Sequence, residues 1–91
     1  MQPEDNFFKG LGSRIRRLRR KAGYSQEDMI SHGFSVRYWQ KIEAGKPITL
    51  RTLIRICRLF SAPMHDLVRG LDVGGTGESI VIQKGSRRTK T

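Results

Sequence analysis

Apolar side chains recur at steps of three and four through residues 6–69, in short windows separated by helix-capping residues. This spacing keeps the apolar residues on one face of an α-helix, whereas a half-buried strand would show strict alternation. The first window contains Phe8, Leu11, Ile15, Leu18 and Ala22. The pattern predicts several short amphipathic helices, and therefore an all-α domain.

Three later windows open with an apolar residue followed by a hydroxyl residue, at Tyr24-Ser25, Phe34-Ser35 and Ile48-Thr49. A Ser or Thr at this position caps the helix N-terminus. The apolar residue before it packs against another apolar residue five positions further along the chain. Ser25 with Asp28 also approximates a capping box. These signals predict helices over 25–32, 35–44 and 50–60. Pro63 suits the first turn of a short further helix that turns Met64, Leu67 and Val68 inward. The predicted inner face of the 50–60 helix is Leu50, Leu53, Ile54, Cys57 and Phe60.

The chain is 91 residues long, which allows one small domain. We expect an N-terminal segment at 1–8, a helical domain at 9–69 and a different C-terminal part at 70–91. That last part reads as a Gly-rich linker, a strand-like segment at 78–83 and a basic tail. A strand that pairs with a second copy and a tail without regular structure both remain open.

Positive charge is concentrated in the part that is predicted to fold. The net charge is +10, and residues 9–69 alone hold fourteen basic and four acidic residues. Such a surface implies a polyanionic partner, nucleic acid first and an acidic membrane second. The other face of the first window is a run of basic residues: Arg14, Arg16, Arg17, Arg19, Arg20 and Lys21. No acidic residue interrupts residues 6–26, so we predict that this face contacts phosphates, through Arg14 and Arg17, rather than being only a solvated helix face.

The 25–32 and 35–44 helices are joined by a tight turn at His32-Gly33-Phe34, the arrangement of a helix-turn-helix. In that arrangement the second helix enters the DNA major groove. If Phe34, Trp39 and Ile42 face the core, the residues that face solvent on this helix are Val36, Arg37, Gln40 and Lys41. Arg and Lys can donate to guanine, Gln can pair with adenine, and a valine methyl can touch a thymine methyl. An ordinary amphipathic helix with a polar outer face is the alternative.

Three segments resemble the phage-repressor, or XRE, class of helix-turn-helix proteins: Leu11 to Arg19, Gly23 to Met29, and Ile42 to Lys46. The resemblance spans about Leu11 to Val68, and it implies a compact five-helix bundle that binds operator DNA as a dimer. It also implies that Gln26 bonds a phosphate and supports the reading helix, and that Val36, Arg37 and Lys41 touch bases. The positions that match sugar-phosphate contacts are Ser35, Tyr38, Gly45 and Lys46.

The chain departs from that pattern at the turn. Ile30 stands where the family has alanine, Gly33 comes one residue early, and Trp39 replaces Ile, Val or Leu. Two larger residues predict overpacking between the helices and a changed angle of the reading helix. Glu43 lies near a helix C-terminus, where the dipole disfavours its charge, so we expect an Arg partner on the first helix.

Other chemistry finds little support in the sequence. A single Cys57 excludes an internal disulfide, and Cys57, His32 and His65 offer no metal-ligand spacing. No nucleophile, base and metal set can be assembled, so we expect no enzyme activity, cofactor or metal. No apolar stretch suits a membrane span or a secretory signal. The single cysteine fits a reducing, cytoplasmic setting.

The leading hypothesis is a small transcriptional regulator, a repressor that binds a palindromic operator in double-stranded DNA as a homodimer and has no membrane partner. The alternative is a DNA-binding antitoxin or co-regulator whose segment 78–83 binds a protein partner. A third hypothesis is a binder of nucleic acid without sequence preference, or of anionic membranes.

Overall fold

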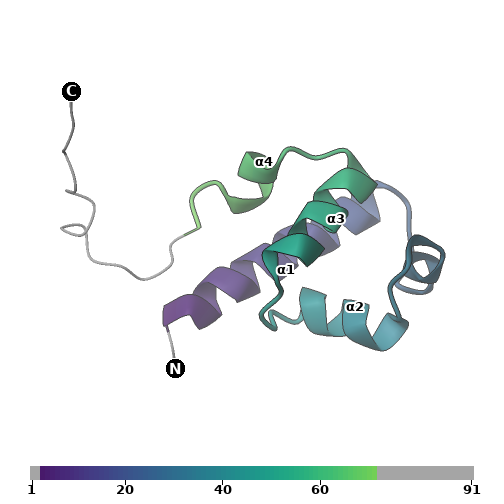
Figure 1. Cartoon of the computed structure of the whole chain (residues 1–91), viewed down its shortest axis with the longest axis horizontal. Helices are drawn as coiled ribbons and strands as arrows, with labels where there is room; N and C mark the ends of the chain where they lie inside the picture. Colours follow the sequence, from purple (N-terminus) through teal and green to yellow (C-terminus); the bar gives the residue numbers. More distant parts are fainter. Residues whose placement is uncertain (1–2, 72–91) are drawn as a thin grey trace.

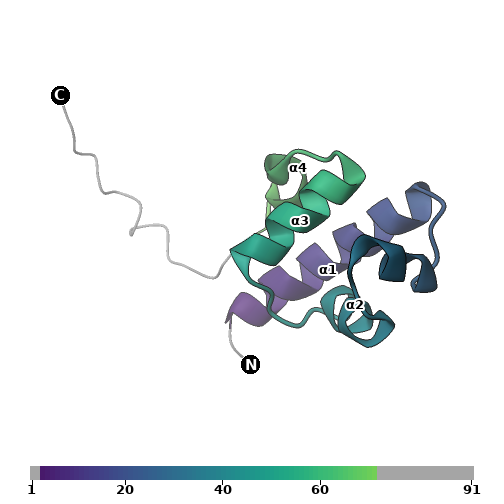
Figure 2. The ribbon, with the colours of Figure 1, turned by 45° about the vertical axis from the view of Figure 1, so that its right-hand side comes forward.

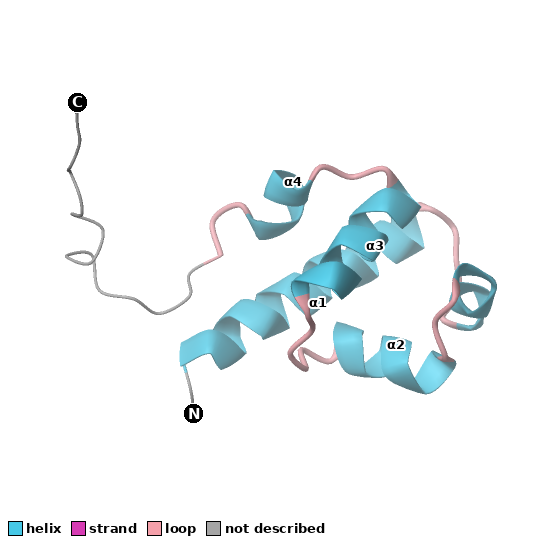
Figure 3. Cartoon of the chain, in the orientation of Figure 1, coloured by secondary structure: helices cyan, strands magenta, loops and turns pink. Residues whose placement is uncertain are grey.

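Five helices and no strand make up the part of the chain, residues 3–71, that the computed structural model describes (Figure 3). The strand-like segment and the basic tail predicted within residues 70–91 lie outside the described residues, as does the linker from residue 72 onward. The helices are α1 (Pro3–Lys21), the 3₁₀-helix η1 (Glu27–His32), α2 (Val36–Glu43), α3 (Leu50–Phe60) and α4 (Met64–Val68).

The long helix α1 organises the domain, since it contacts α2, α3 and α4. In two views related by a rotation about the vertical axis, α3 lies along α1 while α4 and α2 lie above and below (Figures 1 and 2). Helix α1 begins at Pro3, with Glu4 and Asp5 in its first turn, where the helix dipole favours negative charge. Residues 3–8, expected as a separate segment, therefore continue into the first helix.

The capping residues predicted from the sequence are confirmed. The Ser25 hydroxyl accepts a bond from the Asp28 amide at 3.1 Å, and the Asp28 carboxylate accepts one from the Ser25 amide at 2.7 Å. The Ser35 hydroxyl caps α2, and the Thr49 hydroxyl caps α3 in the same way. These bonds join residues three positions apart, so local sequence alone specifies them.

The second helix differs from the prediction in its winding. Residues Glu27–His32 form a 3₁₀-helix rather than an α-helix, with the Gly33 amide bonded to the Ile30 carbonyl at 3.0 Å. A 3₁₀-helix rises about 2.0 Å per residue against about 1.5 Å in an α-helix, so fewer residues cover the same length. The tighter winding accommodates the early Gly33, whose φ of 90° suits glycine.

The core is formed by one apolar cluster from all five helices and the turn before α2. Its buried members are Leu11, Ile15, Met29, Phe34, Trp39, Ile42, Leu53, Ile56 and Leu67. On α3 the predicted inner face is wrong at two positions, because Leu50 and Ile54 are 63% and 41% exposed and Ile56 is buried instead. Apolar residues at steps of three and four define two possible inner faces on this helix. The packing against α1 decides which of the two is buried.

The two residues predicted to overpack the helix-turn-helix are both accommodated. Ile30 is 59% exposed and so adds no volume to the core. Trp39 is fully buried, and its ring packs edge-on against Phe34 with centroids 5.0 Å apart. The expected overpacking is therefore absent at Ile30, while Trp39 serves as a central core residue.

Candidate nucleic-acid interface

Helix α2 has one buried and one exposed face. Trp39 and Ile42 point into the core, whereas Arg37, Gln40 and Lys41 are exposed. Val36, in the first turn, is half-buried. The residues predicted to contact bases thus lie away from the two buried residues of this helix.

A buried carboxylate at the end of α2 ties this helix to α1. Glu43 accepts hydrogen bonds from Arg19 Nε at 2.6 Å and Arg19 Nη2 at 3.1 Å. It also accepts one from the indole N–H of Trp39, one turn earlier on the same helix, and one from the Gln26 amide at 3.2 Å. Only 5% of the Glu43 side chain and 8% of the Arg19 side chain are exposed, so this charge pair is internal.

The electrostatics of the pair favour its ionised form. Burial tends to raise the pKa of Glu43, but the hydrogen bonds from Arg19, Trp39 and Gln26 outweigh it and leave the pKa below its ordinary value. The hydrogen bond with Glu43 raises the pKa of Arg19. Both groups are therefore charged at neutral pH, and each supplies the other's counter-charge.

This pair confirms one prediction and corrects another. The Arg partner expected for Glu43 on the first helix is Arg19. Arg19 itself is not part of a solvated or phosphate-facing surface, as the run of basic residues had indicated, because it is buried and committed to Glu43 and to the Tyr24 carbonyl at 2.8 Å. The role of Trp39 as a donor was missed, although its four-residue spacing from Glu43 on one helix is a usable signal.

The same network reaches the exposed face of α2 through two glutamines. Gln26 precedes η1, and while its amide nitrogen donates to Glu43, its amide oxygen accepts a bond from Gln40 at 3.2 Å. The Gln40 side chain is thereby oriented by a chain of bonds that begins at the buried pair. This arrangement links Gln26 directly to the helix that it was expected to support.

A close backbone approach completes the contact between α1 and α2. A Cβ added to Gly12 would lie 2.5 Å from the carbonyl oxygen of Ile42 and 2.8 Å from that of Glu43. Real Cβ atoms do not approach oxygen atoms so closely, so only glycine permits this spacing. The sequence alone shows Gly12 as a weak point of a helix, whereas the structure gives it a packing role.

The turn before α2 is supported from α3. The Arg55 guanidinium lies over the Phe34 ring, 4.3 Å from its centroid, and donates a bond to the Gly33 carbonyl at 3.4 Å. A cation over an aromatic face is attracted by the electron density of the ring. Arg55 was missed at the sequence level, because nothing local indicates a contact with residues 22 positions away.

Comparison with known proteins bears on this two-helix unit. A family model described as a helix-turn-helix domain matches residues 10–71. The chain belongs to this helix-turn-helix domain family. Searches of curated proteins and of solved structures gave no match. Membership supports DNA as the partner of the helix-turn-helix protein and a regulatory role.

The remaining residues predicted to meet the sugar-phosphate chain lie on or beside α2. In the helix-turn-helix protein the Ser35 hydroxyl is occupied as the helix cap, and the Tyr38 hydroxyl lies 3.4 Å from that of Thr52. Gly45 has a φ of 95° and turns the chain back, so that the Lys46 amide bonds the Lys41 carbonyl at 3.0 Å. Ser35 and Lys46 therefore lie just beyond the two ends of α2.

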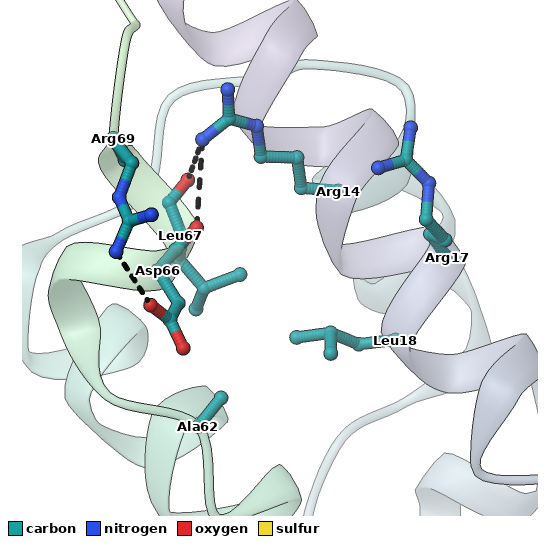
Figure 4. Close-up of a pocket in the computed structure, with 7 residues that line it drawn as sticks. All are labelled: Arg14, Arg17, Leu18, Ala62, Asp66, Leu67 and Arg69. Carbon is teal, nitrogen blue, oxygen red and sulfur yellow. Dashed lines mark hydrogen bonds and ion pairs between the residues drawn. The ribbon is translucent and has the colours of Figure 1, made fainter.

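Arg14 and Arg17 do not lie beside the predicted DNA-contacting residues on and around α2. The Arg14 guanidinium bonds the carbonyl oxygens of Leu67 at 3.2 Å and Asp66 at 3.5 Å, and Arg17 lines the same pocket between α1 and α4 (Figure 4). Two residues along a helix correspond to a rotation of about 200°, so Arg14 projects to the side opposite Gly12 and α2. Their contact with phosphate stays a prediction, and it concerns a different face of the helix-turn-helix protein.

Two further searches of residues 3–71 gave negative findings. No helix in this range has the length and apolar character needed to cross a membrane. No group of three or more His, Cys, Asp or Glu side chains in this range could hold a metal ion.

Proposed function

We propose that the helix-turn-helix protein is a phage-repressor-like, or XRE-class, regulator that binds a specific double-stranded DNA sequence as a homodimer. One observation carries the proposal: the exposed face of α2 presents Arg37, Gln40 and Lys41 while a buried network holds the opposite side of the same helix. Sequence readout needs donors and acceptors held at fixed positions, because each base is distinguished by a pattern of groups.

The chemistry of this face suits the edges of base pairs. Arg37 and Lys41 can donate to the O6 and N7 acceptors of guanine, and the Gln40 amide can pair with adenine. The half-buried Val36 can contact a thymine methyl group at the helix N-terminus, which leads into the groove in this class of domain. Gln40 is held by Gln26, so its amide is offered in a restricted orientation.

Contacts to the DNA backbone would flank this face. We assign Gln26, Ser35, Tyr38, Gly45 and Lys46 to that role. The last four lie at or near the ends of α2, and Gln26 bonds Gln40 and Glu43 of the same helix. Such contacts set the register of a protein on the duplex but carry no sequence information. Arg14 and Arg17 are left out of this set because Arg14 bonds carbonyl oxygens of α4 and Arg17 lines the pocket beside it.

A dimer would place two α2 helices in successive major grooves. For a two-fold symmetric pair the half-sites are separated by about one turn of DNA, or about 34 Å, and the operator is a palindrome. Occupation of such a site would repress transcription by excluding other proteins from it.

Selection of binding sites from a random duplex pool, at near-physiological salt, tests this function. The proposal expects an enriched motif with two-fold symmetry and guanine or adenine at the positions that meet α2. A pool that stays random despite binding would contradict sequence-specific recognition. Enrichment of a single half-site without symmetry would contradict the homodimer while leaving the readout by α2 in place.

A further inference from the structure

An apolar groove lies on the domain, and none of the residues that line it belongs to α2. It has a volume of about 490 Å³ and is lined by ten residues, of which Thr49 is the only polar one. Phe8 from α1, Leu50 and Leu53 from α3, and Val68 from α4 form its walls. Leu50, at 63% exposure, leaves much of this apolar surface open to water, which is unfavourable unless something covers it.

The chain leaves the described part of the structure at this groove. Leu71, the last described residue, lines the groove itself, and its side chain lies so close to Gly10 that a Cβ there would be 2.7 Å from Leu71 Cδ2. Leu71, from which the chain continues in sequence, is therefore part of the open apolar surface.

We propose that the groove is the docking site for this chain's own segment Ile80-Val81-Ile82. These three β-branched residues are the only consecutive apolar run in residues 72–91, and the groove has no charged residue to oppose them. Eight residues lie between Leu71 and Ile80, and the nine steps from one Cα atom to the next span about 30 Å when extended. Gly74, Gly75 and Gly77 lie in that connection and let it bend back.

The tether makes intramolecular docking favourable. A short covalent tether raises the effective concentration of an attached segment to about the millimolar range, so a modest apolar contact is enough to keep the groove occupied. Docking removes Leu50 and its neighbours from water and leaves α2 free. The proposal therefore depends on the fold alone and not on the DNA sequence that the protein reads.

A nitroxide spin label on the tail of the full-length chain provides the test. Cys57, which is half-buried with its thiol pKa raised by that burial, is changed by Cys57→Ala so that Val81→Cys carries the only label. The same chain is also isotope-enriched for NMR. If the tail docks, the nitroxide lies near the groove, and the NMR peaks of Leu50, Leu53 and Val68 should lose intensity. Docking predicts no such loss at His32 and Arg58, which line a different pocket.

Two controls make the result decisive. Adding Ile80→Ser and Ile82→Ser to the labelled chain should restore the lost intensity, while the spectrum with the label reduced confirms that residues 3–71 remain folded. Mixing isotope-labelled chains without a nitroxide with unenriched spin-labelled chains should give no loss. Uniform or absent broadening in the labelled chain would overturn the proposal, and a loss seen in the mixed sample would assign the groove to a second copy.

Discussion

The two sides of α1 contact the rest of the domain through different chemistry. Toward α2, the backbone of Gly12 meets two carbonyl oxygens, and Arg19 and Glu43 form a buried ion pair. Toward α4, Arg14 reaches carbonyl oxygens at a partly exposed pocket, and an apolar groove remains open beside α3.

This difference distinguishes contacts that fix an orientation from contacts that mainly remove surface from water. Hydrogen bonds to a buried charge are directional, and misplacing one partner leaves a charge without compensation. Apolar contacts tolerate small shifts, since they depend chiefly on buried area. The directional side is the one that holds α2, the helix assigned to base contacts.

The largest expected effect follows from removing one charge of the buried pair. Glu43→Gln keeps the size of the side chain but leaves Arg19 charged and unpaired, which typically costs about 3–5 kcal/mol. A control is Asp66→Asn, which removes exposed ion pairs with His65 and Arg69 within α4 and its end and should cost about 1 kcal/mol or less. Urea unfolding of both variants gives the comparison, and equal losses would show that the buried pair contributes no more to stability than an exposed one.

Acid should weaken the same contact. Because the pKa of folded Glu43 lies below its ordinary value, its ionised form stabilises the fold at neutral pH. This contribution is fully present above the ordinary carboxyl pKa of about 4.3 and is lost as the pH falls through the lower pKa of the folded protein. Unfolding free energies measured from pH 7 to pH 3 should fall less steeply in Glu43→Gln, and an unchanged slope would contradict this assignment.

A smaller effect is expected from two glycines in α1. Gly12→Ala forces α1 away from α2 and should destabilise the domain by about 1–3 kcal/mol, as overpacking usually does. Gly10→Ala meets only the flexible end of Leu71 and replaces a helical glycine, so it should be neutral or stabilise by up to about 1 kcal/mol. Thermal unfolding of the two variants separates them, and destabilisation by Gly10→Ala alone would reverse the comparison.

The parts of the fold that could be predicted depend on neighbouring residues. The caps at Ser25, Ser35 and Thr49 were predictable because each bond spans three residues. The bounds of α3 followed from the same local signals. Its inner face did not, since the choice between Ile54 and Ile56 depends on packing against other helices.

The exposed residues of the candidate site were predictable from the sequence, but the buried contacts that hold α2 in place were not. The outward set on α2 followed from helical spacing, and the unfavourable position of Glu43 pointed to an Arg on α1. Which arginine it was could not be derived, because Arg19 and Glu43 are 24 positions apart and a run of basic residues looks uniformly exposed in sequence. The sequence likewise did not show that Ile30, a large apolar residue of η1, is 59% exposed.

The measurement that tests the central claim most directly compares affinity for a selected operator with affinity for unrelated duplex DNA. For the double variant Arg37→Ala and Lys41→Ala, we predict loss of roughly 1–3 kcal/mol of discrimination for each side chain, with weak, salt-sensitive binding retained. The control Lys21→Ala and Arg58→Ala removes the same charge from exposed residues outside α2 and should keep the preference. Undiminished operator preference in the first variant would show that α2 is not the reading helix.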